Sequence, residues 1–309
     1  MVLQPLFNAM CGGLAAFSLW KWGTPQQAAA YAYCATGLIS MAFSTCIVWY
    51  RRPPFFPLPD IGHDLLPTIS TVGGIRAHAI CDHLLCVTML TTLLFIIKQP
   101  RRIIILTRCC MIYGTIMFMR AVTLIITSLP DPYFLCATHT DIMYTWTNMP
   151  WKAVFFDLFL LLGFSPNSQR HFMTCGDMVF SGHTVLFVMC ALVVHTYYKA
   201  TPSINTFKLS MWTVSIIGTT LLLITKMHWT LDIVLAYYIT ITCWNFYHSV
   251  YRALDNGYYI KSVIWIDGVF IYPFIAWIET GCIMTKFWSR NNSRRPKSYT
   301  TFENNPASL

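Results

Sequence analysis

Two short stretches of this sequence set polar residues with catalytic potential into strongly apolar surroundings. The first, CGDMVFSGHT, brings Asp177, Ser181 and His183 to the start of an apolar run. The second, KMHWTLDIVLAYY, places His228 and Asp232 four residues apart, so both lie on one face of a helix. Because polar groups are costly to remove from water, their presence here calls for a chemical or a packing reason.

Two histidines and a carboxylate without metal-type spacing suit covalent phosphoryl transfer. In such a reaction one imidazole attacks phosphorus, a carboxylate orients that ring, and the other imidazole protonates the leaving oxygen. From the HxxxD geometry we assign His228 as the nucleophile, Asp232 as its orienting partner, and His183 as the acid that later becomes the base. The alternative is a buried polar cluster that holds three membrane helices together.

The composition indicates an integral membrane protein. The 309 residues are 56% hydrophobic and only 11% charged, which is far more apolar than a soluble domain. The net charge of +9 does not indicate nucleic-acid binding, because the basic residues lie mostly in loops and the tail beside apolar segments. Orientation in the bilayer and contact with anionic lipid headgroups explain them more simply.

Hydropathy predicts an all-α polytopic membrane protein built as a bundle of six transmembrane helices. These helices form one catalytic membrane domain, 28–251, between a cytosolic N-terminal segment, 1–27, and a cytosolic tail, 252–309. In the tail we expect an interfacial apolar segment at 262–279 and a basic, disordered end. The expected spans are 28–49, 79–97, 103–127, 179–197, 207–225 and 231–251.

The order of the spans predicts where the polar motifs meet. Six crossings return both termini to one side, and the distribution of Lys and Arg favours the cytosol for that side, against Arg51 and Arg52 on the other. The starts of the fourth and sixth spans and the end of the fifth then meet at the lumenal or exoplasmic face. His183, His228 and Asp232 are expected to converge there, with segments 53–67 and 129–174 able to cover them.

Several other polar residues have simpler interpretations. Asp60, His63 and Asp64 lie in the proline-rich stretch PPFFPLPDIGHDLLP and are interpreted as turn formers rather than catalysts. The 12 cysteines lack the paired spacing of a zinc site, and no nucleotide-binding motif is present, so neither a metal nor a cofactor is expected. Cys136 and Cys175 are available for a disulfide if their side of the membrane is oxidising.

SGHT followed by HWTLD after one intervening span resembles the lipid phosphate phosphatase superfamily, in which these motifs carry the roles assigned above. The phosphate-binding elements of that superfamily differ here. There is no KxxxxxxRP, and Leu222 stands where an arginine would precede His228 by six residues. Arg108, Arg120 and Lys226 are candidates for the phosphate-binding cation, with snorkelling or helix pairing as the alternative for each.

A closer resemblance, to the sphingomyelin synthase family, rests on four motifs in order: PLPDIGHDLLP, RCCMIYGTIMFMRAVTLIITSLPDP, CGDMVFSGHT and HWTLDIVLAYYIT. It implies a multi-pass protein of the Golgi or plasma membrane whose site faces the Golgi lumen or the cell exterior. It also implies transfer of phosphocholine from phosphatidylcholine to the primary hydroxyl of ceramide, with release of diacylglycerol. The family's catalytic residues carry over onto His183, His228 and Asp232, with Asp177 as a supporting carboxylate. With the supporting or substrate-binding candidates, the predicted site comprises His183, His228, Asp232, Asp177, Ser181, Arg120 and Arg108.

The fourth motif departs from the relatives at two positions. Met227 stands where an acidic residue usually precedes the histidine, and Trp229 stands where a tyrosine follows it. Because the acidic position is tied to headgroup choice, a ceramide phosphoethanolamine synthase that uses phosphatidylethanolamine is the main alternative. A lipid phosphatase or phospholipase C-like hydrolase, and a catalytically dead lipid transporter or scaffold, are the others. Homo-oligomerisation is left open.

Overall fold

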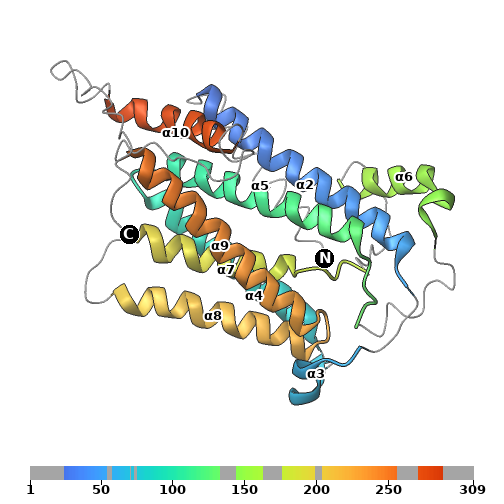
Figure 1. Ribbon diagram of the computed structural model, residues 1–309. Coiled ribbons are helices and arrows are strands. Elements are labelled where there is room, and N and C mark those ends of the chain that lie inside the picture. Colours follow the sequence, from blue (N-terminus) through green and yellow to red (C-terminus); the bar gives the residue numbers. More distant parts are fainter. Residues whose placement is uncertain are drawn as a thin grey trace, which may run out of the picture.

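The computed structural model describes eight stretches of the chain, and these are almost entirely helical (Figure 1). The described residues are 24–53, 58–69, 71–72, 75–132, 144–162, 176–198, 204–255 and 271–287. The predicted all-α class is therefore confirmed. Cys136, Cys175, most of the N-terminal segment and the basic end of the tail lie outside these residues.

Each of the six predicted spans corresponds to a helix. The helices are α2 (Pro25–Arg51), α4 (Ala77–Lys98), α5 (Arg102–Ile126), α7 (Gly182–Tyr197), α8 (Ile204–Ile224) and α9 (Thr230–Asp255). Four of them, α2, α4, α5 and α8, are long and apolar enough to cross a membrane. The chain is thus an integral membrane protein, whereas the count of six crossings stays a prediction: α7 is apolar but has only 16 residues.

The remaining elements lie between these helices or, for α10, after the last of them. They are α3 (Ile61–Leu65), β1 (Thr71–Val72), β2 (Ile75–Arg76), the 3₁₀-helix η2 (Trp146–Asn148), α6 (Trp151–Leu161) and α10 (Tyr272–Phe287). The two strands pair antiparallel, with Thr71 opposite Arg76 and Val72 opposite Ile75. Within the predicted covering segment 129–174, α6 packs against α2.

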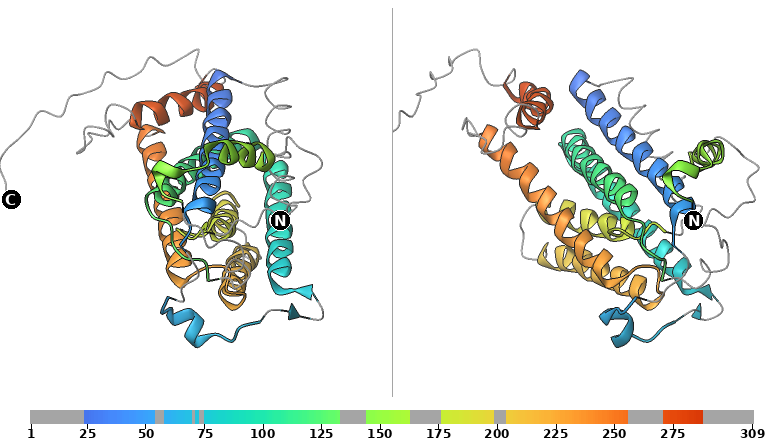
Figure 2. Two further views of the ribbon diagram at one scale, coloured as in Figure 1. Left: turned by 90° about the vertical axis from the view of Figure 1, so that its right-hand side faces the viewer. Right: turned by 45° about the vertical axis from the view of Figure 1, so that its right-hand side comes forward.

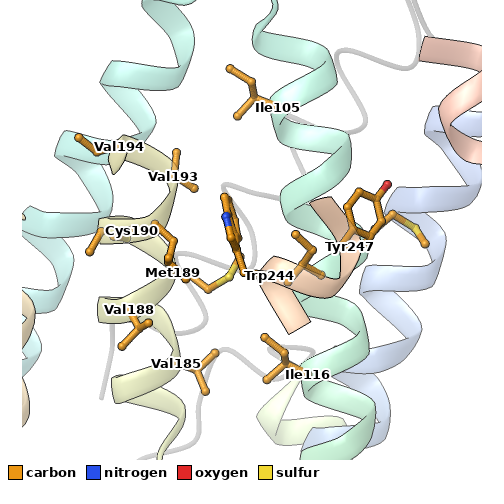
Figure 3. Packing of buried hydrophobic residues seen from close by; sticks show 14 of the residues in the cluster. Ile105, Ile116, Val185, Val188, Met189, Cys190, Val193, Val194, Trp244 and Tyr247 are labelled. Atoms are coloured by element: carbon orange, nitrogen blue, oxygen red, sulfur yellow. The ribbon is translucent and has the colours of Figure 1, made fainter. Parts of the chain in front are cut away.

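The centre of the bundle is α7, which packs against α4, α8 and α9. Nearly every α7 side chain from Thr184 to Val194 is buried. Trp244 of α9 reaches between α7 and α5, beside Met189 (Figure 3), and its indole N–H donates to the hydroxyl of Thr196 at 3.1 Å. α7 therefore has a fixed position, which in turn fixes the motif at its N-terminus.

The outer helices turn apolar side chains away from the protein. Val87, Leu90 and Leu94 on α4 and Ile216 and Ile217 on α8 are about half exposed. Large exposed apolar surfaces are unfavourable in water but match the hydrocarbon of a bilayer. These faces support the assignment of α4 and α8 as membrane-spanning helices.

α3 and α10 lie at opposite ends of the bundle (Figures 1 and 2). At one end, α3 packs against α8 and α9, close to where α8 ends and α9 begins. At the opposite end, α10 packs against α2 and against α9. The convergence of motifs predicted from the sequence falls at the α3 end.

The α10 end is held by a buried ion pair. Arg108 of α5 donates from Nε and from one terminal nitrogen to the two carboxylate oxygens of Glu279, both at 2.9 Å, and Tyr247 donates to the same carboxylate at 3.0 Å. The Arg108 guanidinium also lies 3.6 Å from the ring centre of Tyr251. The sequence indicated an apolar segment here, but not a carboxylate buried in the bundle. Its interfacial placement stays a prediction.

Replacing Glu279 with alanine is expected to lower the free energy of unfolding by about 3–5 kcal/mol, because the Arg108 guanidinium would stay buried without its carboxylate. Thermal unfolding in detergent micelles measures the effect. Thr280→Ala, an exposed position on the same helix, serves as the control and should be nearly neutral. Equal melting temperatures for both variants would show that the ion pair contributes nothing.

Candidate functional site

The two motif histidines lie side by side at the α3 end of the bundle. His183 is the second residue of α7, and His228 lies in the turn that joins α8 to α9. Their ring centroids are 6.1 Å apart. A nucleophile needs about 3–3.5 Å to phosphorus, and an acid needs about 2.6–3.2 Å to the leaving oxygen. The two rings are therefore close enough to contact one phosphoryl group.

His228 has a carboxylate behind it. Its Nδ1 lies 3.6 Å from Oδ2 of Asp232, one turn along the start of α9, slightly longer than a hydrogen bond. The same carboxylate accepts the backbone N–H of Trp229 at 3.1 Å, so its orientation is fixed. His228 and Asp232 are 5% and 1% exposed. This arrangement directs Nε2 of His228 away from Asp232 and keeps the pair out of bulk water.

Asp82 of α4 lies beside His183 as Asp232 lies beside His228, and it is not among the site residues predicted from the sequence. Its Oδ1 lies 3.2 Å from Nε2 of His183, with both side chains partly buried. A carboxylate in this position stabilises an imidazolium and selects the tautomer of the ring. One signal was available: an acidic residue inside the predicted span 79–97 is costly in a membrane and is usually retained for function.

A second ion pair lies next to the histidines. Asp177 and Arg120 approach to 2.7 Å, and Arg120 is 3% exposed. A Cβ at Gly182 would collide with the Arg120 guanidinium, so glycine is what lets this cation reach the backbone beside His183. Nε of Arg120 is buried and has no hydrogen-bond partner among the described residues. Arg120 therefore brings a positive charge and an unused donor to the site.

Ser181 organises the motif through its hydrogen bonds. Its hydroxyl caps α7 by accepting the backbone N–H of Thr184 at 3.2 Å, and its own N–H donates to the carbonyl of Asp232 at 3.1 Å. The residue is fully buried. It thereby joins the N-terminus of α7, which carries His183, to the N-terminus of α9, which directly follows the turn that holds His228.

Arg108 lies away from this cluster. It precedes Arg120 by twelve residues on α5, which is about 18 Å along a helix axis. Its guanidinium is engaged by Glu279 at the other end of the bundle. We therefore do not include Arg108 in the proposed site. Lys226 lies closer, in the α8–α9 turn, where its backbone has φ of 54°.

The surroundings of His228 favour its neutral form. Burial, followed by the electrostatic influence of the neighbouring His183 and Arg120, lowers the pKa of His228 to about 3, against a smaller opposing effect of Asp177. An imidazole with such a pKa carries a free lone pair at neutral pH. That is the state in which a histidine can attack phosphorus.

Comparisons with known protein families and curated proteins agree with the motifs. The family model described as PAP2 superfamily C-terminal matches residues 174–249, which contain both histidines and Asp232. The human protein named sphingomyelin synthase-related protein 1 is 30% identical over 255 residues, covering 81% of this chain and 56% of the relative. The predicted resemblance to the sphingomyelin synthase family is confirmed.

Two further relatives carry names that state an activity. Phosphatidylcholine:ceramide cholinephosphotransferase 1 of Caenorhabditis elegans is 28% identical over 236 residues, or 74% of this chain and 47% of the relative. Human phosphatidylcholine:ceramide cholinephosphotransferase 2 is 28% identical over 242 residues, which cover 75% of this chain and 60% of the relative. The chain spans about half the length of the curated relatives it matches.

Proposed function

We propose that this protein is a phosphatidylcholine:ceramide cholinephosphotransferase, which moves phosphocholine from phosphatidylcholine to the primary hydroxyl of ceramide and releases diacylglycerol. The observation that carries the proposal is the pair of imidazole rings 6.1 Å apart, each with its own carboxylate, at one end of a membrane bundle. Both substrates are lipids, so they can enter such a site from the bilayer.

In the proposed mechanism the two rings divide the work. Neutral His228 attacks phosphorus, and its orientation is set by Asp232. His183, supported by Asp82, gives a proton to the departing diacylglycerol oxygen. A phosphocholine group is then bound covalently to His228. His183 next takes the proton from the ceramide hydroxyl, which attacks phosphorus and regenerates the free imidazole.

Arg120 is proposed to bind the nonbridging phosphate oxygens. Its charge is buried, it adjoins the backbone of Gly182 beside His183, and its Nε has no partner among the described residues. Asp177 holds the guanidinium in that position at 2.7 Å. Arg120 thus takes over the part of the superfamily arginine that this sequence replaces with Leu222. No metal ion or cofactor is required by these steps.

The alternatives differ in the product, so one assay separates them. Purified protein in liposomes with fluorescent ceramide is offered phosphatidylcholine or phosphatidylethanolamine, and the lipids are resolved by thin-layer chromatography. We expect sphingomyelin as the main product, with a smaller amount of the ethanolamine analogue because Met227 supplies no charge for choosing between headgroups. Exclusive use of phosphatidylethanolamine identifies a ceramide phosphoethanolamine synthase. Release of a soluble headgroup identifies a hydrolase. If neither lipid is converted, the remaining alternative is a catalytically dead transporter or scaffold.

The site is proposed to face the lumen of the Golgi or the exterior of the plasma membrane, with both termini in the cytosol. A glycosylation sequon engineered within residues 138–141 should then be modified in cells, while the natural sequon at Asn291 should stay unmodified. Gel mobility before and after glycosidase treatment gives the answer. Modification at Asn291 alone would put the histidines on the cytosolic side and reject this orientation.

A further inference from the structure

The segment at the start of α3 forms hydrogen bonds with the start of α9. Asp60, the N-cap residue of α3, accepts from the backbone N–H of His63 at 3.0 Å, as an ordinary helix cap does. The interpretation of Asp60 as a turn-forming residue is therefore confirmed. The same carboxylate also accepts from Thr230, 170 residues later, through the backbone N–H at 2.8 Å and the hydroxyl at 2.6 Å.

The contact is reciprocal. The Thr230 hydroxyl, which donates to Asp60, accepts the backbone N–H of Gly62 at 3.1 Å. A Cβ at position 62 would overlap the Thr230 hydroxyl, so glycine permits the close approach. Although burial raises the pKa of Asp60, the hydrogen bonds from Thr230 and His63 outweigh it and hold the pKa below its usual range. The carboxylate therefore stays ionised, and hydrogen bonds to an ionised group are strong.

His63 adds a contact with the backbone of His228 itself. Its Nε2 donates to the carbonyl oxygen of His228 at 3.0 Å. Its ring also lies 5.1 Å from the ring of Trp229, whose indole N–H donates to the carbonyl of Pro130 at 2.9 Å. The three consecutive residues 228, 229 and 230 are thus each bound by a group from outside the α8–α9 hairpin.

This matters because His228 lies in a turn, not in a helix. The turn contains Lys226 with φ of 54°, a conformation that costs free energy for a residue other than glycine. α9 begins only at Thr230, and the Trp229 carbonyl accepts its first backbone hydrogen bonds, from Asp232 at 3.1 Å and from Ile233 at 3.4 Å. The position of the His228 ring is consequently set by what holds residues 228–230.

We propose that Asp60, His63 and Thr230 form a latch that fixes the backbone of His228 so that its imidazole meets the phosphorus atom of the donor lipid. The three are positioning residues, since they act through His228. The inference rests on the proposed role of His228 as nucleophile. A misplacement of about 1 Å can cost on the order of 10²-fold in rate. Loss of the latch should accordingly lower kcat and leave the binding of the lipids unchanged.

Two matched pairs of variants test the latch. Thr230→Val keeps the shape of the side chain but removes its hydroxyl, whereas Thr230→Ser keeps the hydroxyl. His63→Phe keeps a ring beside Trp229 but removes the donor, whereas His63→Gln retains a donor at the position of Nε2. We expect about a 10-fold or greater loss of kcat for the Val and Phe variants, with KM for phosphatidylcholine within about twofold of the native value. The Ser and Gln variants should stay within about threefold of native kcat.

The measurements are kcat and KM in liposomes and the melting temperature of each variant in detergent. Native kcat in the Val and Phe variants would overturn the latch. Loss of folding in both the Val and Phe variants would also overturn it, because the contacts would then serve the structure only. The same holds if the Ser and Gln variants lose as much kcat as the Val and Phe variants. A native protein without transfer activity, or an unaffected His228→Ala variant, would instead reject the proposed function. An active native protein that depends on His228 but tolerates Thr230→Val rejects the latch alone.

Discussion

Replacing His228 with alanine is expected to abolish both the phosphorylated enzyme and the transfer of phosphocholine to ceramide. The ring is the only protein group that bonds to phosphorus in the proposed mechanism, so the covalent intermediate cannot form without it. Radiolabelled phosphatidylcholine, with and without ceramide, measures the two reactions separately. A donor with a much better leaving group should not rescue the variant, because the missing group is the nucleophile.

Two companion variants sharpen this result. Asp232→Asn keeps the ring roughly in place but removes the charge that stabilises an imidazolium, so its activity should fall between native and His228→Ala. His195→Ala changes an exposed histidine near the far end of α7 and should retain native activity. Full activity of His228→Ala would contradict the shared site altogether.

Replacing His183 with alanine is expected to reduce turnover by about 10²-fold or more, because both proton transfers lose their donor and acceptor. In contrast with His228→Ala, a donor with a better leaving group should restore formation of the phosphorylated enzyme. Such a leaving group departs without a proton from His183. Single-turnover experiments with the natural and the activated donor measure the difference.

Asp82, the carboxylate beside His183, provides a companion variant for this prediction. Asp82→Asn keeps a hydrogen-bonding group next to Nε2 and removes the charge, so we expect an effect in the same direction as His183→Ala but smaller. If the activated donor instead rescued His228→Ala, with the adduct mapped to His183, the roles of the two histidines would have to be exchanged.

Much of the helical framework was predictable, because a run of about 20 apolar residues has few other ways to satisfy its backbone in a membrane. All six predicted spans are helices. The spacing of His228 and Asp232 correctly predicted that the two side chains lie close together, at 3.6 Å. The predicted shared helix face was wrong, because α9 begins only at Thr230 and His228 lies in the turn before it. Segment ends were less accurate: α7 begins at Gly182 rather than 179, because the Ser181 hydroxyl caps the helix there.

The side-chain pairs that complete the site could not be read from spacing. Asp82 and His183 are 101 positions apart, and their contact depends on how α4 packs against α7. Asp60 and Thr230 are 170 positions apart, and a proline-rich segment with a turn-forming aspartate predicts nothing about its distant partner. An acidic residue in an apolar run signals a function, but only the tertiary structure supplies its partner.

The apolar segment after α9 gives a further example. The sequence placed its end at Glu279, a natural boundary for an interfacial helix, whereas α10 runs from Tyr272 to Phe287 with Glu279 in its middle. Pro273 lies in the first turn, where a proline removes no helical hydrogen bond. Glu279 can be buried because it pairs with Arg108. The α5 sequence alone did not show which group would pair with the charge of Arg108.

Trapping the phosphorylated enzyme tests the proposed transfer most directly. Native protein in nanodiscs is mixed with phosphatidylcholine labelled in the headgroup, quenched without ceramide, and mapped by mass spectrometry; a parallel sample receives ceramide before the quench. We expect phosphocholine on His228 in the first sample, and its quantitative appearance in sphingomyelin in the second. Label on another residue, or direct transfer to ceramide with no adduct under single-turnover conditions, would contradict covalent catalysis by His228.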